Sequence, residues 1–542
     1  MSEASRHRTR LVGLGLAFLF VVMAGRGSYL ALSEPPSRGP GALLTASLDK
    51  RADIVDRNGE LLATSVVSWS LWANPSLIWD GEEAASKLVT VFPDLDEATL
   101  ARRLSQPGRE FVWVKRGLTP RQREQVVELG VEALDFREEA RRAYPRGVLA
   151  GQVLGYTNVD GEGLGGVELA YDASLRAGAA PVRLTLDIGA QAALEAELAT
   201  AAMDYDIIGG AAILMDTATG EIRGMASWPP FDPNRASDTP TNDPGRTNRA
   251  IGAVYELGSV FKPLTVAAAL EAGAVRPSDQ FDIGRPLQVR SFQVRDTHWI
   301  GQRANLTRIL SESSNIGTVQ VNLALGPQRQ MQFLERAGLT RRAPIGLPGS
   351  AAPLVPTRLD EVTSATMSYG HGISVTPLAF LTAFAAFGNE GRLVTPKIIA
   401  GEASPGEPAR LVSEATASLV TDMMRESVVN GTGRRSEVAG YRVAGKTGTA
   451  EKPVPGGYDK DRNVTSFAAI FPADSPRYAL IVTLDEPKPI EDGGMTAAVN
   501  AAPVAGRIIE RVAPLFGIDP RLEDLRPAAS GQRSLADNRS EL

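Results

Sequence analysis

The sequence predicts an α+β fold for most of its length, built on one antiparallel sheet whose strands come from distant parts of the chain. Short strand-like segments fall into two groups: 182–186, 211–215 and 221–228, then 466–471 and 478–484. The intervening residues 250–435 are dominated by Ala-rich helical patterns. Strands at both ends with helices between them indicate a sheet that is closed by the last strands and flanked by helices.

Composition excludes several classes of protein. The chain has 542 residues, which at roughly 150 residues per domain suggests three or four units. Its 57 Lys and Arg against 63 Asp and Glu give a net charge of −6, and no stretch is strongly basic, so no nucleic-acid partner is expected. There is no cysteine, only three histidines and no HExxH motif, so disulfides, iron–sulfur clusters and a histidine-based metal site are not expected.

The N-terminus predicts a membrane anchor. A basic segment, 1–10, precedes an apolar run over 11–32, which as a helix is about 33 Å long and spans a bilayer. The positive-inside rule places residues 1–10 in the cytoplasm and everything after Ser33 outside. A cleaved signal peptide is the alternative, because the uninterrupted apolar core, 11–25, is short and Ala31-Leu32-Ser33 resembles a cleavage site.

Residues 33–50 are rich in Pro, Gly and Ser and are predicted to be a linker. A mixed region, 51–180, follows. Within it, residues 111–114 are strand-like, Thr119 to Gln122 has the form of a capping box with Pro at the first helical position, and 131–136 alternates like a returning strand.

The larger region, 181–518, contains the strands and helices of the main sheet. Residues 190–203 are predicted to be helical, and 211–215 with 221–228 a hairpin around the turn at 217–220. Apolar residues become sparse after Ile518, so 519–542 is predicted to be a disordered tail.

Three short motifs carry the predicted chemistry: Ser259-Val-Phe-Lys262, Ser313-Ser-Asn315 and Lys446-Thr-Gly448. Each is weak alone, and S-x-x-K occurs a second time at Ser47 to Lys50 in the linker. Their order and separations, 54 residues and then 133, strengthen the interpretation as a serine acyl-transfer site.

The first motif lies at the start of an apolar helix. Because positions i and i+3 share a helix face, Lys262 can reach the Ser259 hydroxyl. Burial near the positive end of a helix lowers the pKa of a lysine and favours the neutral amine that a general base requires. The alternative for this motif alone is an N-cap serine with a surface lysine.

The other two motifs supply polar groups. Ser313 and Asn315 follow a helical stretch, 306–311, and are predicted to form a loop tip pointing into a cleft, although an ordinary turn has the same pattern. Residues 443–450 are predicted to be a strand, in which Gly448 leaves space for a substrate backbone and Thr447 and Thr449 offer hydroxyl groups. A glycine bulge with an exposed lysine is the alternative.

Together these motifs resemble those of class B penicillin-binding proteins, single-pass proteins whose catalytic domain is a D,D-transpeptidase. The resemblance covers most of 10–517 and includes further segments: Arg51–Gly59, Tyr144-Pro145, Gly155-Tyr156, Gly165–Glu168, Leu184–Asp187, Asn248–Ala250, Tyr369–Gly372 and Thr376-Pro377. The short N-terminal region and Tyr-Gly-His-Gly are similar to the division-type, FtsI-like branch. The departures, Ala52, Leu257 and Ser350, touch none of the reactive groups.

The resemblance implies a role for each site residue. Ser259 attacks the D-Ala-D-Ala end of a peptidoglycan stem peptide, Lys262 is its base, and Ser313 relays a proton to the leaving amine. Asn315 holds the stem-peptide amide, Lys446, Thr447 and Thr449 bind the terminal carboxylate, and the N–H groups of Ser259 and Thr449 form the oxyanion hole. No metal or organic cofactor is implied, and β-lactams are expected inhibitors.

The resemblance also implies the arrangement of the chain. Its expected parts are a cytoplasmic tail, 1–10, a transmembrane anchor, 11–32, a linker, 33–50, a dimerisation-type pedestal, 51–180, a transpeptidase domain with a helical subdomain, 181–518, and a disordered tail, 519–542. The catalytic domain is expected in the periplasm of a bacterium, held at the inner membrane. Expected partners are an FtsW-like glycosyltransferase of the SEDS type and other membrane proteins of the divisome, which build the septum.

Other functions remain as alternatives. An elongation-type class B enzyme shares every motif. A serine β-lactamase needs a second base, and no Glu-x-x-Leu-Asn follows Ser313. An inactive wall-assembly scaffold would not need the four reactive groups. A Ser–His–Asp hydrolase would need His298 or His371, but no G-x-S-x-G is present and both are expected to make structural hydrogen bonds.

Overall fold

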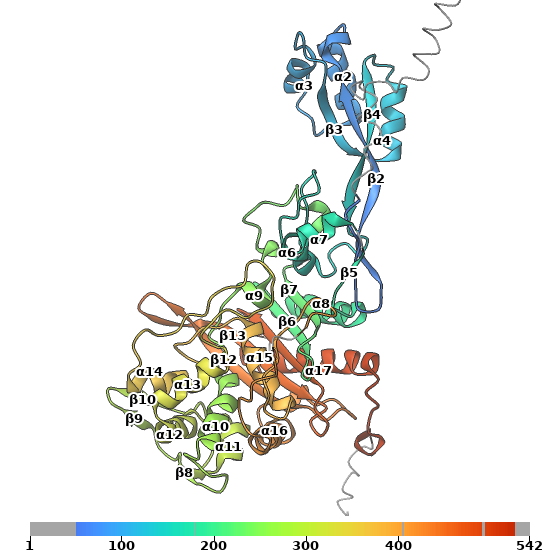
Figure 1. Ribbon diagram of the computed structural model, residues 1–542. Helices are drawn as coiled ribbons and strands as arrows, with labels where there is room; N and C mark the ends of the chain where they lie inside the picture. The colour runs from blue at the N-terminus through green and yellow to red at the C-terminus, as the bar shows by residue number, and fades with distance from the viewer. Residues whose placement is uncertain (1–49, 179, 404–405, 490–493, 526–542) are drawn as a thin grey trace, which may run out of the picture. The chain divides into compact units, whose positions relative to one another are not determined.

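The centre of the fold is a five-stranded antiparallel sheet in the order β12-β13-β14-β6-β7 (Figure 1). The structure, a computed structural model, describes residues 50–178, 180–403, 406–489 and 494–525. The sheet strands are β6 (Gly209–Asp216), β7 (Ile222–Trp228), β12 (Ala444–Val454), β13 (Gly457–Phe471) and β14 (Tyr478–Asp485). β14 pairs with β6, with Ile481 opposite Ile213. The prediction of one sheet closed by sequence-distant strands is therefore confirmed.

Both faces of the sheet are covered, which explains why β6 and β14 are apolar without alternation. On one face, Ala212 and Leu214 of β6 lie in a core with α8 (Ile188–Tyr205) and α17 (Ala501–Val512). On the other face, Ile213 lies in a core with α10 (Lys262–Glu271) and α15 (Pro377–Phe384). The sheet is thus buried between helices, and pairing with β13 sets the register of β12, with Lys446 opposite Ala468.

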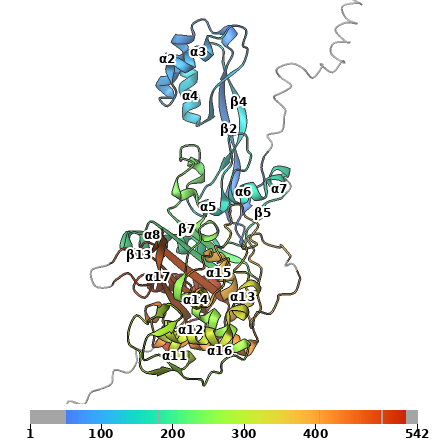
Figure 2. The same ribbon diagram turned by 90° about the vertical axis from the view of Figure 1, so that its left-hand side faces the viewer.

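A group of helices packs beside β12 and forms the predicted helical subdomain. Figures 1 and 2 both show these helices lying together: α11 (Leu306–Ser311), α12 (Asn315–Leu325), α13 (Pro327–Arg336) and α16 (Glu414–Val429). Smaller elements complete the region: α14 (Glu361–Met367), β8 (Phe281–Asp282), β9 (Leu287–Val289), β10 (Phe292–Val294) and β11 (Arg303–Ala304). The short helix α9 (Arg249–Gly252) instead packs against β6, β7 and α15.

The N-terminal region builds a second sheet, in the order β3-β2-β1-β5 with β4 also paired to β2. Its strands are β1 (Ile54–Val55), β2 (Leu61–Ala73), β3 (Val112–Leu118), β4 (Leu134–Ala143) and β5 (Val182–Arg183). Its helices are α2 (Gly81–Val91), α3 (Glu97–Leu104), α4 (Pro120–Glu128), α5 (Gly151–Leu154), α6 (Gly166–Ala170) and α7 (Asp172–Ala177). Buried leucines of β2, α2 and α3 form its small core.

Local signals in this region were mostly reliable. The capping box at Thr119 and Gln122 is present with both reciprocal bonds, and α4 begins at Pro120 as predicted. The returning strand is displaced: β4 starts at Leu134 and continues through a charged stretch to Ala143, because it pairs with β2 over its full length. The strand 182–186 was predicted to belong to the main sheet, but β5 pairs with β1 of the N-terminal sheet and ends early, at Arg183. Leu184 then makes only an isolated bridge to Ile399.

The C-terminal prediction needs a correction. Disorder was expected from residue 519, but the chain up to residue 525 is held against the region of the main sheet. The Arg442 guanidinium donates to Asp524 at 3.0 Å, and the Arg521 N–H donates to the Gly440 carbonyl at 3.0 Å. The remaining residues of that expected tail, 526–542, lie outside the described residues.

The predicted cytoplasmic tail, anchor and most of the linker, together 1–49, also lie outside the described residues. Within the parts of the chain that the structure describes, no helix has the length and apolar character needed to cross a membrane.

Candidate active site

Ser259 lies in a tight turn that is packed against β12. It sits half-buried in a 3₁₀ turn, Gly258–Phe261, that leads directly into α10. Gly258 has a φ of +61°, and a Cβ there would stand 2.7 Å from the Thr449 carbonyl oxygen. A Cβ on Gly370 would stand 2.2 Å from the Gly258 carbonyl oxygen. Two glycines thus let the Ser259 turn fit closely between β12 and the Tyr369–Gly372 segment.

Lys262 is fully buried and belongs to the first turn of α10, as predicted. Its amine contacts the Ser313 carbonyl, the Ser313 hydroxyl at 3.1 Å and Asn315 Oδ1 at 2.8 Å. Burial, and next the charge of Lys446, hold the pKa of Lys262 well below its usual value, and Asp296 opposes this in part. The lowered pKa favours the neutral amine, whose lone pair can take a proton.

Lys446 approaches the same hydroxyl from β12. It is also fully buried, and its amine donates to Ser313 Oγ at 2.9 Å and to the Thr447 carbonyl at 3.0 Å. Burial lowers its pKa to about 7. The two amines therefore lie on either side of one hydroxyl, and this arrangement permits a proton to pass from Lys446 through Ser313 to Lys262.

Ser313 lies in a turn after α11, as predicted, but Asn315 was expected at the same loop tip and is instead the first residue of α12. Ser313 itself has a φ of +62°, a conformation that is costly for a residue with a side chain and that its surroundings must impose. Ser314 caps α12, because its hydroxyl accepts from the Gly317 N–H at 2.9 Å.

Asp296 holds this loop from outside the three motifs. Its carboxylate accepts from the Ser314 hydroxyl at 2.7 Å and from the Ile316 N–H at 3.0 Å. The neighbouring Arg295 carbonyl accepts from Asn315 Nδ2 at 3.1 Å. Sequence reasoning missed Asp296, since a single acidic residue in the polar loop after β10 carries no pattern that would distinguish it.

The β12 motif differs from expectation at Gly448. The glycine was expected to leave space for substrate, but a Cβ there would stand 2.3 Å from the Leu257 carbonyl oxygen. The space is therefore occupied by the backbone that precedes Ser259. Of the two threonines, Thr447 Oγ1 lies 2.7 Å from Thr432 Oγ1, and Thr449 Oγ1 accepts from the Ala497 N–H at 3.0 Å.

Hydrogen bonds thus join Lys262, Ser313, Asn315, Lys446 and Thr447 into one network, with Thr449 and Gly448 on the same strand. Ser259 precedes Lys262 in the same turn, but none of the hydrogen bonds of Lys262 within the described chain goes to the Ser259 hydroxyl. The hydrogen-bond network therefore includes Lys262, the expected base, while Ser259, the expected nucleophile, lies next to the network without a bond to Lys262.

The two described histidines differ in role. His298 is half-exposed and its Nε2 lies 3.3 Å from Glu312 Oε2. His371 is largely buried between the rings of Tyr369 and Tyr458, and burial lowers its pKa to about 4. Its Nδ1 has no hydrogen-bond partner among the described residues, so the expected structural hydrogen bond is not seen at that atom. No group of three or more His, Asp and Glu suited to hold a metal occurs in the described parts of the chain.

Comparison with known proteins gives a consistent result. Residues 210–510 match the penicillin binding protein transpeptidase domain, and 47–187 match the penicillin-binding protein dimerisation domain. The chain is 37% identical to a probable peptidoglycan D,D-transpeptidase FtsI of Caulobacter vibrioides, over 96% of this chain and 90% of that protein. It is 31% identical to the peptidoglycan D,D-transpeptidase FtsI of Escherichia coli K12, over 87% of this chain and 84% of that protein.

A solved structure agrees. Penicillin binding protein 3 of Mycobacterium tuberculosis, complexed with aztreonam, has a TM-score of 0.68 and 27% identity, and the match covers 87% of this chain and 97% of that one.

Proposed function

This chain belongs to the class B penicillin-binding proteins, the peptidoglycan D,D-transpeptidases of the FtsI type, and from this premise we propose how its residues divide the work. Ser259 is the nucleophile and Lys262 its general base. Ser313 and Lys446 move protons, and Asn315, Thr447 and Thr449 hold the stem peptide. The observation that carries the assignment is the convergence of two buried amines on the Ser313 hydroxyl, at 3.1 Å and 2.9 Å.

Acylation requires Lys262 as a neutral amine, which its lowered pKa favours. As a neutral amine it takes the Ser259 proton while Ser259 Oγ attacks the penultimate D-Ala carbonyl. The negative charge that develops on the carbonyl oxygen is stabilised by the N–H groups of Ser259 and Thr449, worth about 3 kcal/mol for each donor. The proton then passes through Ser313 to the leaving D-Ala amine, which departs and leaves an ester on Ser259.

In the second half of the reaction Ser259 is the leaving group, and Lys262 returns a proton to it. The amine of a neighbouring stem peptide attacks the ester carbonyl, its proton passes to Lys262 and from there to Ser259 Oγ, and the carbon–oxygen bond breaks. A peptide cross-link forms and the free serine returns. Exclusion of water protects the ester until the amine arrives.

Two finer assignments extend the proposal. The apolar run at 11–32 anchors the protein in the inner membrane, with residues 1–10 cytoplasmic and the described chain periplasmic. An FtsW-like glycosyltransferase and other divisome membrane proteins supply and place the strands to be cross-linked at the septum. N-terminal sequencing of membrane-extracted protein tests the anchor, because a start near Glu34 would contradict it.

The lifetime of the drug adduct tests the function. The full chain is acylated with penicillin, free drug is removed, and the intact mass is followed over time. We expect an adduct that outlasts many catalytic cycles, since loss of a water-activating base slows a step by about 10²–10⁴-fold. Release within seconds, with excess hydrolysed drug, would instead identify a β-lactamase.

A further inference from the structure

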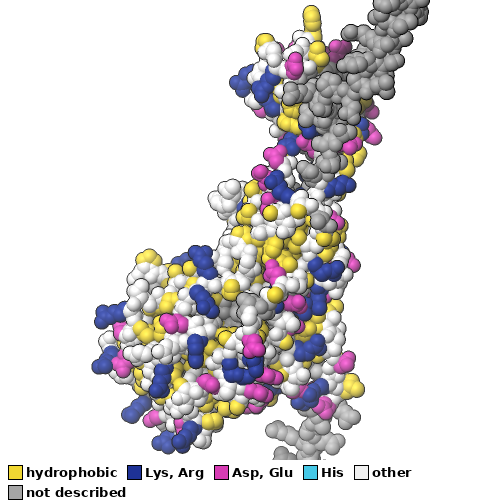
Figure 3. All heavy atoms as spheres, viewed as in Figure 1, with side chains coloured by type: hydrophobic (Ala, Val, Ile, Leu, Met, Phe, Trp, Pro, Cys, Tyr) yellow, Lys and Arg dark blue, Asp and Glu magenta, His cyan; other side chains and the backbone are white. Residues whose placement is uncertain are grey.

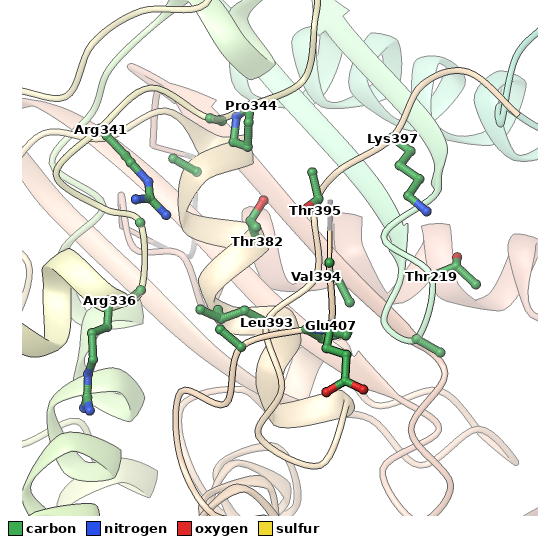
Figure 4. A pocket seen from close by; sticks show the side chains of 18 residues that line it. Thr219, Arg336, Arg341, Pro344, Thr382, Leu393, Val394, Thr395, Lys397 and Glu407 are labelled. Carbon is green, nitrogen blue, oxygen red and sulfur yellow. The ribbon is translucent and has the colours of Figure 1, made fainter. Parts of the chain in front are cut away.

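A cavity of about 530 Å³ lies away from the three motifs and contains none of their residues. It is formed where the β6–β7 turn, the end of α13, α15 and the segments 393–397 and 406–409 meet. Figure 4 shows Arg341 and Lys397 on opposite walls, with Thr382 and Thr395 between them. Cavities of this size are typical of sites for small ligands or short peptide segments.

The charge of this cavity is unusual for the molecule. It contains three cations, Arg336, Arg341 and Lys397, against one carboxylate, Glu407, in a chain whose net charge is −6. Lys and Arg are elsewhere interspersed with Asp and Glu, as Figure 3 shows for one face. Within the described residues, none of these three cations has a salt bridge or a side-chain hydrogen bond, whereas Arg51, Arg142 and many others are paired. Unpaired cations in a concave site favour an anionic ligand.

Backbone hydrogen bonds fix the position of Lys397 in one wall of the cavity. The Lys397 N–H donates to the Gly220 carbonyl at 2.9 Å, and the Lys397 carbonyl accepts from the Ile222 N–H and from the Thr185 hydroxyl, both at 2.9 Å. On the other wall, Gly338 turns the chain after α13 with a φ of +78°, and the exposed side chain of Arg341 follows this turn. The charge of Arg336 also lowers the pKa of Glu271, which lies outside the cavity, so we place Arg336 at the rim of the cavity.

The lining indicates which anion would fit. A planar guanidinium suits a carboxylate, which it can bind through two parallel hydrogen bonds. Buried Ala379 and Val394 contribute apolar surface beside the threonine hydroxyls, which suits a short peptide with methyl groups. A peptidoglycan stem peptide combines these features, because it carries alanyl methyls, amides and several carboxylates.

We propose that this cavity, held between Arg341 and Lys397, is a second binding site for a carboxylate-bearing stem peptide of the peptidoglycan strand. The inference rests on the proposed function, which makes such strands the substrate. A glycan strand carries many stem peptides, so one bound here raises the effective concentration of another at Ser259.

The test separates this site from the catalytic one. The full chain in detergent is first acylated with penicillin, which blocks Ser259, and is then titrated by calorimetry with L-alanyl-γ-D-glutamyl-meso-diaminopimelate. The same peptide with its carboxylates converted to amides, and inorganic phosphate, are the comparison ligands. The test variant is Arg341→Ala with Lys397→Ala. The matched control, Arg342→Ala with Arg358→Ala, removes the same charge outside the cavity.

We expect saturable binding to the acylated protein, at least about ten-fold weaker in the test variant and unchanged in the control, because each hydrogen bond to a charged group is worth about one factor of ten or more. The test variant and the control variant should both acylate with penicillin at the same rate. Equal binding of the amidated peptide, loss of binding on acylation, or phosphate bound in place of the peptide would each overturn the proposal. Failure of acylation itself would instead count against the proposed function.

Discussion

Replacement of Asp296 by asparagine is expected to slow acylation and, at the same time, to shift its pH dependence. The carboxylate accepts from the Ser314 hydroxyl and the Ile316 N–H, at 2.7 and 3.0 Å. Asparagine keeps the shape but presents an NH₂ group to one of these donors, so one hydrogen bond to a charged group is lost. Such a bond is worth about 1.5–3 kcal/mol, and acylation should fall about ten- to a hundred-fold if the loop that places Ser313 relaxes by that amount.

The pH effect has a defined sign. The negative charge of Asp296 raises the pKa of Lys262, while burial and Lys446 lower it. Removal of that charge lowers the pKa of Lys262 further, so the neutral base persists to lower pH and the acid limb of the acylation rate moves to lower pH.

The assay is stopped-flow or quenched acylation by a fluorescent penicillin between pH 5 and 9, with thermal melting as the check on folding. Asp279→Asn is the control, because Asp279 is only partly buried and its carboxylate accepts from the Arg276 N–H alone, at 2.8 Å. An Asp296→Asn protein with the wild-type rate, or with an acid limb moved to higher pH, would refute the assignment of Asp296 as the residue that positions the Ser313 loop.

Three further predictions concern stability. The pKa of Lys446 is about 7 in the folded protein against 10.5 for a free lysine, so the unfolded chain binds more protons over that interval and this residue should make stability rise with pH from about 7 to 10.5, by about 1.4 kcal/mol per pH unit. Lys446→Met should reduce the pH slope of the thermal midpoints, with the contribution of Lys262 remaining, and an undiminished slope would contradict it. Gly448→Ala places a Cβ 2.3 Å from the Leu257 carbonyl oxygen and should cost about 1–3 kcal/mol and most penicillin labelling, so normal labelling would count against the close fit. Glu168 is fully buried and pairs with Arg51 and Arg142 at 2.5 and 2.6 Å, so Glu168→Gln should destabilise the N-terminal region by about 3–5 kcal/mol, with limited proteolysis as the measurement and unaltered resistance as the contrary result.

Much of the fold could be predicted because its signals are local. The hairpin of β6 and β7, the capping box of α4 and the strand pair of β13 and β14 all come from patterns in short, continuous stretches of sequence. The strand β4 was placed less well, since its charged sequence has no strand pattern and its extent is set by pairing with β2.

In the site, too, local sequence motifs predicted some features, while others depend on tertiary contacts. The motif order indicated Lys262, Ser313 and Lys446, and the structure brings their side chains together. Asp296 and the close fit at Gly448 could not be predicted, because both depend on tertiary contacts between segments that are distant in sequence. The left-handed conformation of Ser313 likewise follows from its surroundings and has no sequence signature.

The central claim is that Ser259 carries the acyl group, and peptide mapping of the penicillin adduct tests it most directly. The full chain is labelled with penicillin, digested and analysed by tandem mass spectrometry, beside Ser259→Ala and Ser47→Ala proteins with matched thermal midpoints. We expect one penicilloyl group, on Ser259, absent from the first variant and retained in the second. An adduct on Ser47 or Ser313, or undiminished labelling of Ser259→Ala, would contradict the account.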